Sequence, residues 1–255
     1  MTLASYSHFD SAPPAELLQW AVGEFGDRLA ITTSFQSEGM VVVDMAAKIS
    51  SKIRVITLDT GRLPEETYAM IEMVRGHYGI NVETVSPDAG EVDAMVTRFG
   101  PNLFYESVPF RSLCCHVRKV RPLERKLQEF QAWAVGLRRS QSETRELLDK
   151  VAEVDGRVKI SPLADWSRQQ VEDYIHANGV PRHPLYAKGY ESIGCGPCTR
   201  VTRPGEDERA GRWWWEHDAN KECGIHFTPD GRVERTVDVL IRDVLAGSHS
   251  QTQNA

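Results

Sequence analysis

The sequence predicts an α/β fold in which a parallel, twisted sheet is covered by helices on both faces. Short apolar runs rich in Ile, Val and Leu alternate with longer segments whose apolar residues follow helical spacing. Strands that alternate with helices of about 10 to 15 residues indicate βαβ units and hence a parallel sheet. Polar residues directly follow several of the apolar runs, as expected where ligands bind at the carboxyl ends of parallel strands.

The first predicted elements are a helix, a buried strand and a second helix. Residues 15–25 carry apolar side chains at helical spacing after two prolines, and Gly26 ends that helix. A strand is predicted over residues 28–33, followed by a polar turn over 34–39 and an apolar helix over 40–49. A strand, a small-polar turn and a helix N-terminus can together bind an anion through free backbone N–H groups and the helix dipole. A plain strand-to-helix connection explains the same pattern.

The later elements are predicted from the same signals. Further strands are expected over residues 52–58, 80–85, 132–137 and 158–163. Further helices are expected over residues 64–78, 91–99, 123–130 and 167–177, the last with Asp165 or Ser167 as its N-cap. Residues 179–211 are expected to be mostly loop, residues 233–245 to form an amphipathic helix, and the last residues to be disordered. Residues 1–212 are expected to form one α/β domain and residues 213–255 a C-terminal segment.

Charge and cysteine usage narrow the functional classes. A formal net charge of −6 argues against a nucleic-acid-binding protein, although it allows a local basic pocket for an anion. The five cysteines form an adjacent pair, a spaced pair and a singleton, not a disulfide framework, which indicates a reducing compartment. The N-terminus lacks the features of a signal peptide, and Asp44 interrupts the longest apolar run, so no membrane association and a cytoplasmic location are expected.

The stretch over residues 193–226 concentrates groups that carry chemistry. Cys195 and Cys198 have ligand spacing, because two intervening residues let a turn aim both sulfurs at one metal. A cationic segment with three consecutive tryptophans follows. Cys223 then lies beside Lys221, which favours the reactive thiolate form and makes Cys223 a candidate nucleophile.

Cys114 and Cys115 complete a set of four cysteines with Cys195 and Cys198, the number that a [4Fe–4S] cluster or a Cys₄ zinc site requires. Cys195-Gly-Pro-Cys198 also has the letters of a thioredoxin-type redox pair. Such a pair should follow an early strand and open a helix, whereas this one lies in a late Gly/Pro-rich loop. Adjacent cysteines suit the separate iron corners of a cluster better than a single tetrahedral ion, so the spacing favours a cluster over zinc.

Four motifs together give the chain a family resemblance. They are Cys-Cys-x-x-Arg-Lys, Cys-x-x-Cys-Thr-Arg, Arg-x-Gly-Arg-Trp-Trp-Trp and Lys-Glu-Cys-Gly-Ile-His, and the match runs from about Ile31 to His226. In these motifs the chain resembles the assimilatory adenylylsulfate (APS) reductases, thioredoxin-dependent members of the wider PAPS/APS reductase family. The resemblance implies a fold like the PP-loop ATP pyrophosphatases, with adenosine bound at the strand ends.

The resemblance also implies a reaction. Cys114, Cys115, Cys195 and Cys198 would ligate one [4Fe–4S] cluster per chain, and Cys223 would be the nucleophile. Its thiolate would attack the sulfur of APS, expel AMP and leave a Cys–S–SO₃⁻ intermediate. Thioredoxin, or a glutaredoxin-like reductant, would then release sulfite for cysteine biosynthesis.

By the same resemblance, cations surround the phosphosulfate group of the substrate. A thiolate and a phosphosulfate repel each other by roughly 4 kcal/mol at about 4 Å and an effective dielectric near 20, so cations must offset the repulsion. The implied phosphosulfate contacts are Lys119, Arg209, Arg212 and His226. The implied nucleotide contacts are Ser34, Ser37, Arg62, Arg138 and Arg145. The tryptophans at 213–215 are expected to anchor their segment on the core.

Three rival functions remain at this point. A PAPS reductase is the nearest, but in the family it usually lacks the four cluster cysteines. A cluster-bearing PP-loop tRNA-thiolating enzyme should have the full pyrophosphatase loop and a basic surface, and the turn Ser34-Phe35-Gln36-Ser37-Glu38 departs from that loop. A non-enzymatic iron–sulfur sensor gives no reason for a fifth cysteine. Self-association into a homo-oligomer is left open.

Overall fold

A computed structural model describes residues 6–142, 145–216, 240–242 and 244. The chain divides into two compact units, which are described separately. The sheet unit comprises residues 1–57, 64–84 and 126–193, and the cysteine unit comprises residues 58–63, 85–125 and 194–255. The boundary expected at residues 212/213 stays a prediction.

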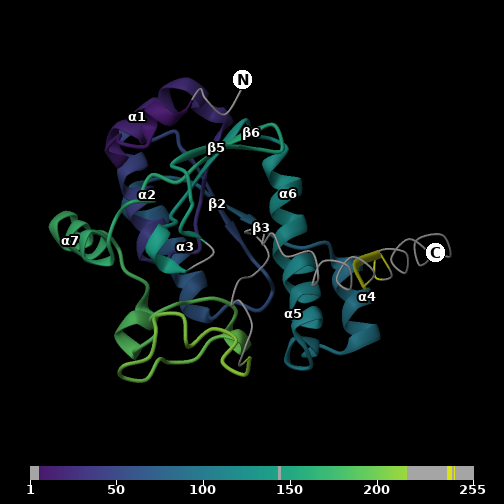
Figure 1. The fold of residues 1–255 in the computed structure, drawn as a ribbon. Helices are drawn as coiled ribbons and strands as arrows, with labels where there is room; N and C mark the ends of the chain where they lie inside the picture. Colours follow the sequence, from purple (N-terminus) through teal and green to yellow (C-terminus); the bar gives the residue numbers. More distant parts are fainter. Residues whose placement is uncertain (1–5, 143–144, 217–239, 243, 245–255) are drawn as a thin grey trace. The chain divides into compact units, whose positions relative to one another are not determined.

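The sheet has six strands in the order β3-β2-β1-β4-β6-β5 (Figure 1). In chain order the strands are Leu29–Thr32 (β1), Arg54–Leu58 (β2), Val82–Val85 (β3), Ala132–Val135 (β4), Val151–Val154 (β5) and Arg157–Ile160 (β6). Strand β1 pairs in parallel with β2 and β4, and β4 pairs in parallel with β6. The predicted α/β fold with a mostly parallel sheet is confirmed, and the five predicted strands are present within three residues of their expected ends.

Strand β5 was not predicted. It pairs antiparallel with β6 across a two-residue turn in which Asp155 and Gly156 both have positive φ, at 50° and 73°. An Asp-Gly turn between two short apolar runs is a strong hairpin signal, and it stands in the sequence at this point. The strand itself carries little apolar pattern from which to predict it, because only Val151 of the four β5 residues is buried.

Four helices belong wholly to the sheet unit: Pro14–Phe25 (α1), Glu65–Tyr78 (α3), Arg168–Asn178 (α7) and Ser37–Ile49 (α2), the last beginning three residues earlier than predicted. Ser167 is the N-cap of α7, because its side chain accepts the Gln170 N–H and the Gln170 side chain accepts the Ser167 N–H. Gly79 and Gly179 end α3 and α7 in the left-handed conformation that glycine adopts without steric cost. The start of α7 at its Ser167 cap and the ends of α3 and α7 at glycine therefore follow from the residue type at each position.

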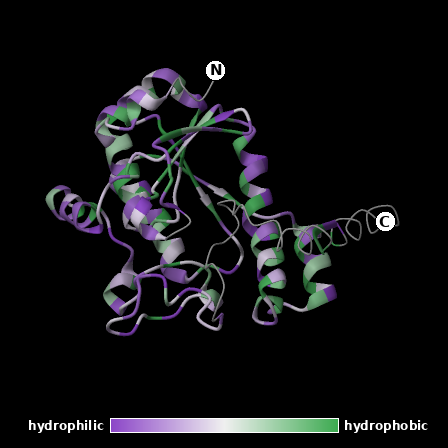
Figure 2. Ribbon diagram, viewed as in Figure 1, coloured by the Kyte–Doolittle hydropathy of each residue, from purple (hydrophilic) through white to green (hydrophobic). Residues whose placement is uncertain are grey.

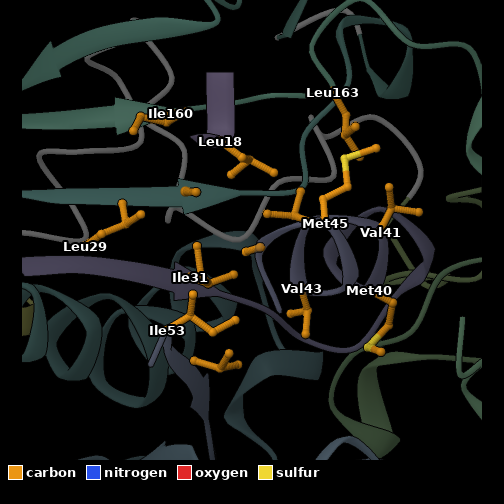
Figure 3. Close-up of a cluster of buried hydrophobic side chains, with 14 of the residues drawn as sticks. Leu18, Leu29, Ile31, Met40, Val41, Val43, Met45, Ile53, Ile160 and Leu163 are labelled. Atoms are coloured by element: carbon orange, nitrogen blue, oxygen red, sulfur yellow. The ribbon is translucent and has the colours of Figure 1, made fainter. Parts of the chain in front are cut away.

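Buried apolar side chains form one core in the sheet unit. Figure 2 shows hydrophobic residues along the strands of the sheet. Ile31 of β1, Val43 of α2 and Ile160 of β6 are fully buried in it. Figure 3 shows Met45 of α2 reaching toward Leu163, the residue that follows β6 by three positions. Burial of each such side chain contributes about 1.5–3 kcal/mol to the free energy of folding.

Asp44 is the polar exception among the buried residues of α2. It is 2% exposed, and its carboxylate accepts hydrogen bonds from Tyr78 of α3 at 3.1 Å and Tyr174 of α7 at 2.7 Å. Lys48 completes the group with an ion pair of 2.7 Å. A buried carboxylate needs such compensation. Asp44 therefore links α2 to α3 and α7.

The cysteine unit contains α4 (Ala89–Phe99) and α5 (Val108–Cys115), and α5 continues through a π-helical turn at His116–Val120 into α6 (Arg121–Leu127). Helix α5 was not predicted, although Ser107 caps it by accepting the Phe110 N–H at 3.3 Å. The predicted helix over 233–245 lies mostly outside the described residues. Its described part, Leu240–Arg242 and Val244, is helical, and Val244 is 2% exposed in the core of this unit.

Within the described ranges, no helix has the length and apolar character needed to cross a membrane.

The close approach of Gly136 to α2 yields a stability prediction. A Cβ on Gly136 would lie 2.5 Å from the Glu38 carbonyl carbon and also in contact with the Gly39 nitrogen. Since both are backbone atoms, Gly136→Ala should lower the free energy of unfolding by about 1–3 kcal/mol in a denaturant titration. The matched control is Gly23→Ala in α1, where a Cβ meets nothing within 4 Å. That change should leave the protein unaffected or up to about 1 kcal/mol more stable, and equal losses in both variants would contradict the packing argument.

Candidate functional site

The turn between β1 and α2 is held by contacts within itself. Phe35 is fully buried at a φ of 59°, a conformation uncommon for a residue other than glycine. Its N–H donates to Thr33 Oγ1 at 2.9 Å. The same hydroxyl lies 2.5 Å from the position that a Cβ on Gly39 would take, so a side chain there would displace the turn. These contacts fix the shape of the turn that carries Ser34 and Ser37.

Ser37 opens α2 and carries a buried hydroxyl. Its N–H donates to the Tyr186 hydroxyl at 3.1 Å, while its Oγ has no hydrogen-bond partner among the described residues. A buried hydroxyl in that state costs about 1–3 kcal/mol, so Ser37 is suited to contact a ligand. Ser34 is exposed, and its Oγ accepts a hydrogen bond from Gln36 Nε2 at 3.1 Å.

Arg138, which follows β4, is joined to α2 by a buried ion pair. Its Nε donates to Glu38 Oε1 at 2.7 Å, and the two side chains are 3% and 12% exposed. A further bond runs from Arg138 Nη1 to Ser140 Oγ at 2.7 Å. Glu38 offsets the charge of Arg138, so this arginine contributes orientation more than net positive charge.

Arg145 is brought to the same end of the sheet unit by Gln141. The Gln141 Oε1 accepts the Arg138 N–H at 3.1 Å and an Arg145 guanidinium N–H at 2.5 Å. Arg145 is 8% exposed. The predicted residues of the sheet unit, Ser34, Ser37, Arg138 and Arg145, therefore gather around the ends of β1 and β4.

Arg62 belongs to the cysteine unit and not to this group. Its guanidinium donates to the Pro101 carbonyl at 2.7 Å and to Asn102 Oδ1 at 2.8 Å, and it lies 5.2 Å from the centroid of the Phe104 ring. These contacts fix the side chain within the loop that follows α4.

The four cysteines predicted as ligands come together in the cysteine unit. Cys114 and Cys115 end α5. Cys195 precedes the 3₁₀ turn Gly196–Cys198 and Cys198 ends it, with the Cys198 N–H donating to the Cys195 carbonyl at 2.9 Å. All four are free thiols, all are buried, and all belong to one apolar core with Leu113 and Trp213. Among the described residues, no three or more Cys, His, Asp or Glu side chains form a cage for a single metal ion.

Polar groups act unequally on the four thiols. Burial opposes ionisation of Cys195, yet Lys119, a hydrogen bond with Thr60 and Arg212 outweigh it and lower the pKa of this thiol. Thr60 Oγ1 and Cys195 Sγ are 3.2 Å apart. Burial and the neighbouring cysteines instead raise the pKa of Cys114 and of Cys198, each to about 12. Positive charge is thus concentrated beside Cys195.

Lys119 and Arg212 reach this position by different routes. Lys119 lies in the π-helical turn that directly continues the cysteine-bearing helix α5. Arg212 is paired with Thr199 in an antiparallel bridge, and its segment is further held by the bond from the Trp213 N–H to the Cys198 carbonyl at 3.1 Å. Arg209 opens this segment, and its N–H donates to Asp207 Oδ1 at 2.8 Å.

The three consecutive tryptophans differ in burial. Trp213 is fully buried, and Trp215 packs against the same core with its ring centroid 4.4 Å from that of Tyr105. The prediction that this segment is anchored on the core is confirmed for these two. Trp214 is 46% exposed.

Cys223 and His226 lie outside the described residues, so their predicted roles stay predictions.

Sequence reasoning missed four groups near these residues: Glu38, Thr60, Arg111 and Glu216. Glu38 stands in the first turn of α2, where an acidic side chain is favoured by the helix dipole, so its pairing with Arg138 had no visible signal. Thr60 lies in a polar strand end that the pattern did mark. Arg111 and Glu216 pair over 105 positions of sequence, and no local spacing indicates such a contact.

The chain matches the phosphoadenosine phosphosulfate reductase domain family over residues 28–201. The adenosine 5'-phosphosulfate reductase of Burkholderia cepacia is 47% identical over 209 residues, which are 81% of this chain and 84% of that protein. The protein of the same name from Allochromatium vinosum is 46% identical over 217 residues, 84% of each chain.

Solved structures agree with this match. A phosphoadenylyl-sulfate (PAPS) reductase from Candida auris, in a phosphate complex, superposes with a TM-score of 0.66 at 29% identity over 77% of this chain and 97% of that one. The FMN adenylyltransferase of Candida glabrata shares the fold alone, with a TM-score of 0.52 at 12% identity over 90% of this chain and 81% of that one. The chain therefore belongs to the phosphoadenosine phosphosulfate reductase family.

Proposed function

We propose that this protein reduces APS to sulfite and AMP with electrons from thioredoxin or a glutaredoxin-like protein, in sulfate assimilation. The observation that carries the proposal is the buried set of four cysteines with Lys119 and Arg212 acting on Cys195. Relatives named adenosine 5'-phosphosulfate reductase, at 46–47% identity, support APS as the nucleotide. Free thiols at the four described cysteines agree with a reaction in the cytoplasm. Self-association stays a prediction.

We further propose that Cys114, Cys115, Cys195 and Cys198 hold a [4Fe–4S] cluster. The donor set fits, because four buried cysteines share one apolar core, and cysteine thiolates are the ligands that such a cluster takes. Bound iron would keep all four sulfurs ionised and would join α5 to the turn at 196–198.

The proposed chemistry begins at Cys223. Its thiolate attacks the sulfur of APS, a sulfur–sulfur bond forms, and the bond from sulfur to the phosphate oxygen breaks, with the electron pair leaving on AMP. A thioredoxin thiolate then attacks Cys223 Sγ and releases sulfite with the electron pair of the sulfur–sulfur bond. The second thioredoxin thiol resolves the mixed disulfide, so thioredoxin is oxidised to its disulfide as sulfur is reduced.

The residues of the cysteine unit would meet the negative charge of both reactants. Lys119 acts as a point charge, and Arg209 and Arg212 can grip anionic oxygens with planar forks. We assign His226 to the same group from its motif. These cations lower the repulsion between thiolate and phosphosulfate, which would otherwise amount to roughly 4 kcal/mol at about 4 Å and an effective dielectric near 20.

The nucleotide would be held by Ser34, Ser37, Arg138 and Arg145 of the sheet unit. The role of Arg62, in the cysteine unit, stays a prediction. The Ser37 hydroxyl, buried and without a partner among the described residues, can donate to a phosphate oxygen at the N-terminus of α2. Arg138 keeps Glu38 as its counter-ion, so it would position the turn and not add net charge. PAPS carries an additional phosphate, and the relatives named adenosine 5'-phosphosulfate reductase support selectivity for APS.

The proposal is tested by measuring sulfite from APS and from PAPS, with reduced thioredoxin and anaerobically purified protein. We expect kcat/KM for APS to exceed that for PAPS by at least about 100-fold, the ratio that about 2.7 kcal/mol of discrimination gives. Equal use of PAPS would mean that the protein is not selective for APS. No sulfite from either nucleotide would favour the thiolation and sensor functions instead.

The control for that assay is Cys223→Ser. The variant should release no sulfite, because an alcohol cannot form the sulfur–sulfur bond. Its visible absorption from the cluster should equal that of the wild type, since Cys223 is not one of the four proposed ligands. Loss of that absorption in Cys223→Ser would contradict the division of roles among the five cysteines.

Lys119→Ala should lower kcat/KM for APS by about 10- to 100-fold, because one charge-assisted contact to an anion contributes roughly 1.5–3 kcal/mol. The matched control is Lys52→Ala, an exposed lysine of the sheet unit. Steady-state kinetics that are unchanged in Lys119→Ala would remove this lysine from the site.

A further inference from the structure

A buried ion pair joins α5 to the segment over 209–216 within the cysteine unit. Arg111 lies three residues before Cys114 and is 2% exposed. Its Nε donates to Glu216 Oε1 at 2.5 Å, and the two side chains are 3% and 5% exposed. Unlike the exposed ion pairs elsewhere in the chain, this one has lost nearly all contact with water.

Such a pair is poorly explained by stability. Removing two charges from water costs several kcal/mol per ion, and well-packed apolar residues of similar size are often as stable or more so. Moreover, Glu216 Oε2 is buried with no hydrogen-bond partner among the described residues. Burial of this oxygen without a partner destabilises the folded state by about a further 1–3 kcal/mol. The pair is better explained by the orientation that it gives to its neighbours.

The neighbour that it orients is Trp213. The Arg111 guanidinium lies 4.5 Å from the centroid of the Trp213 ring. Trp213 is fully buried and has a φ of 42°, which a residue with a side chain adopts only when its surroundings hold it there. From α5, Arg111 contacts the Trp213 ring and pairs with Glu216 of the same segment as Trp213, so the ion pair supplies part of that restraint.

Trp213 in turn contacts Arg212. The Arg212 guanidinium lies 4.7 Å from the centroid of the same ring and is 6% exposed. The guanidinium also lies close to Gly194, because a Cβ added to Gly194 would lie 2.5 Å from Arg212 Cζ. The ring and the Gly194 backbone together leave the guanidinium little freedom. The position of Arg212 therefore depends on the position of the Trp213 ring.

The negative charge of Glu216 also limits the repulsion between Arg111 and Arg212. Arg111 and Arg212 both contact one ring, so their two positive charges lie near each other. Glu216 neutralises Arg111 and leaves Arg212 as the cation of this group that acts on Cys195. Without the carboxylate, the uncompensated charge of Arg111 would repel Arg212 and the segment that carries it.

We propose that Arg111 and Glu216 are positioning residues that hold Arg212, through the Trp213 ring, in the orientation that binds the anionic group of the substrate. The proposal rests on the function proposed above and assigns no contact between substrate and either residue of the ion pair.

The first test is Glu216→Gln, which keeps the size of the side chain and removes its charge. We expect KM for APS to rise about tenfold with little change in kcat, because a contact made in both ground and transition states is weakened. The matched control is Glu206→Gln, the same substitution ten residues earlier. Glu206 forms a partly exposed ion pair with Arg200, with side chains 26% and 30% exposed, so KM should stay within about twofold of the wild type.

The second test separates position from stability. Glu216→Gln leaves a buried arginine uncompensated and should lower the melting temperature. The double variant Arg111→Met with Glu216→Leu removes both charges, so its melting temperature should return toward that of the wild type. Its KM for APS should nevertheless remain about tenfold raised, because nothing restores the orientation of Trp213.

A wild-type KM in the double variant would overturn the inference and leave the ion pair a structural feature, even if Glu216→Gln fails to fold. Failure of the proposed function is distinguishable, because the wild type itself would then yield no sulfite from APS. In that case AMP binding, measured by calorimetry on the same variants, decides the inference: unchanged affinity in the double variant would overturn it.

Discussion

Burial of four cysteine sulfurs in one apolar core is the constraint on which the rest of the cysteine unit depends. A buried thiol resists ionisation, and the raised pKa values of Cys114 and Cys198 express that resistance. Cys195 departs from it, because Lys119, Thr60 and Arg212 favour its thiolate. The π-helical turn that carries Lys119 and the bridge that carries Arg212 both bring a cation to Cys195. A chain with a net charge of −6 thus concentrates positive charge where anionic reactants would meet.

Each unit neutralises one of its buried arginines with a carboxylate. In the sheet unit, Arg138 is neutralised by Glu38 and bonded to Ser140, so it shapes the turn at the start of α2. In the cysteine unit, Glu216 neutralises Arg111, and that arginine shapes the surroundings of Arg212. In each case a buried carboxylate removes the charge of one arginine and leaves its planar group as a structural element. The charge that remains available for an anion is then limited to a few defined side chains.

Local pattern predicted most of the fold, because buried parallel strands such as β1 and β4 are short apolar runs whatever lies around them. It failed at β5, an edge strand with one buried residue, and at α5, whose interior carries the charged Arg111. The motifs predicted that Cys114, Cys115, Cys195 and Cys198 lie together, and the four side chains share one core. The motifs could not indicate Glu38 or Glu216, because these act through partners about 100 positions away, and only the folded chain makes such pairs. Hence residues that belong to a motif are more visible in sequence than residues that act through a distant partner.

The most direct measurement is the metal and sulfide content of the protein purified without oxygen, with its visible and Mössbauer spectra. We predict about four iron atoms and four acid-labile sulfides per chain, as a [4Fe–4S] cluster requires. Both should be lost when any one of Cys114, Cys115, Cys195 or Cys198 is changed to Ser. One zinc ion per chain without iron, or full iron content in a Cys195→Ser variant, would contradict the proposal that these four cysteines hold the cluster.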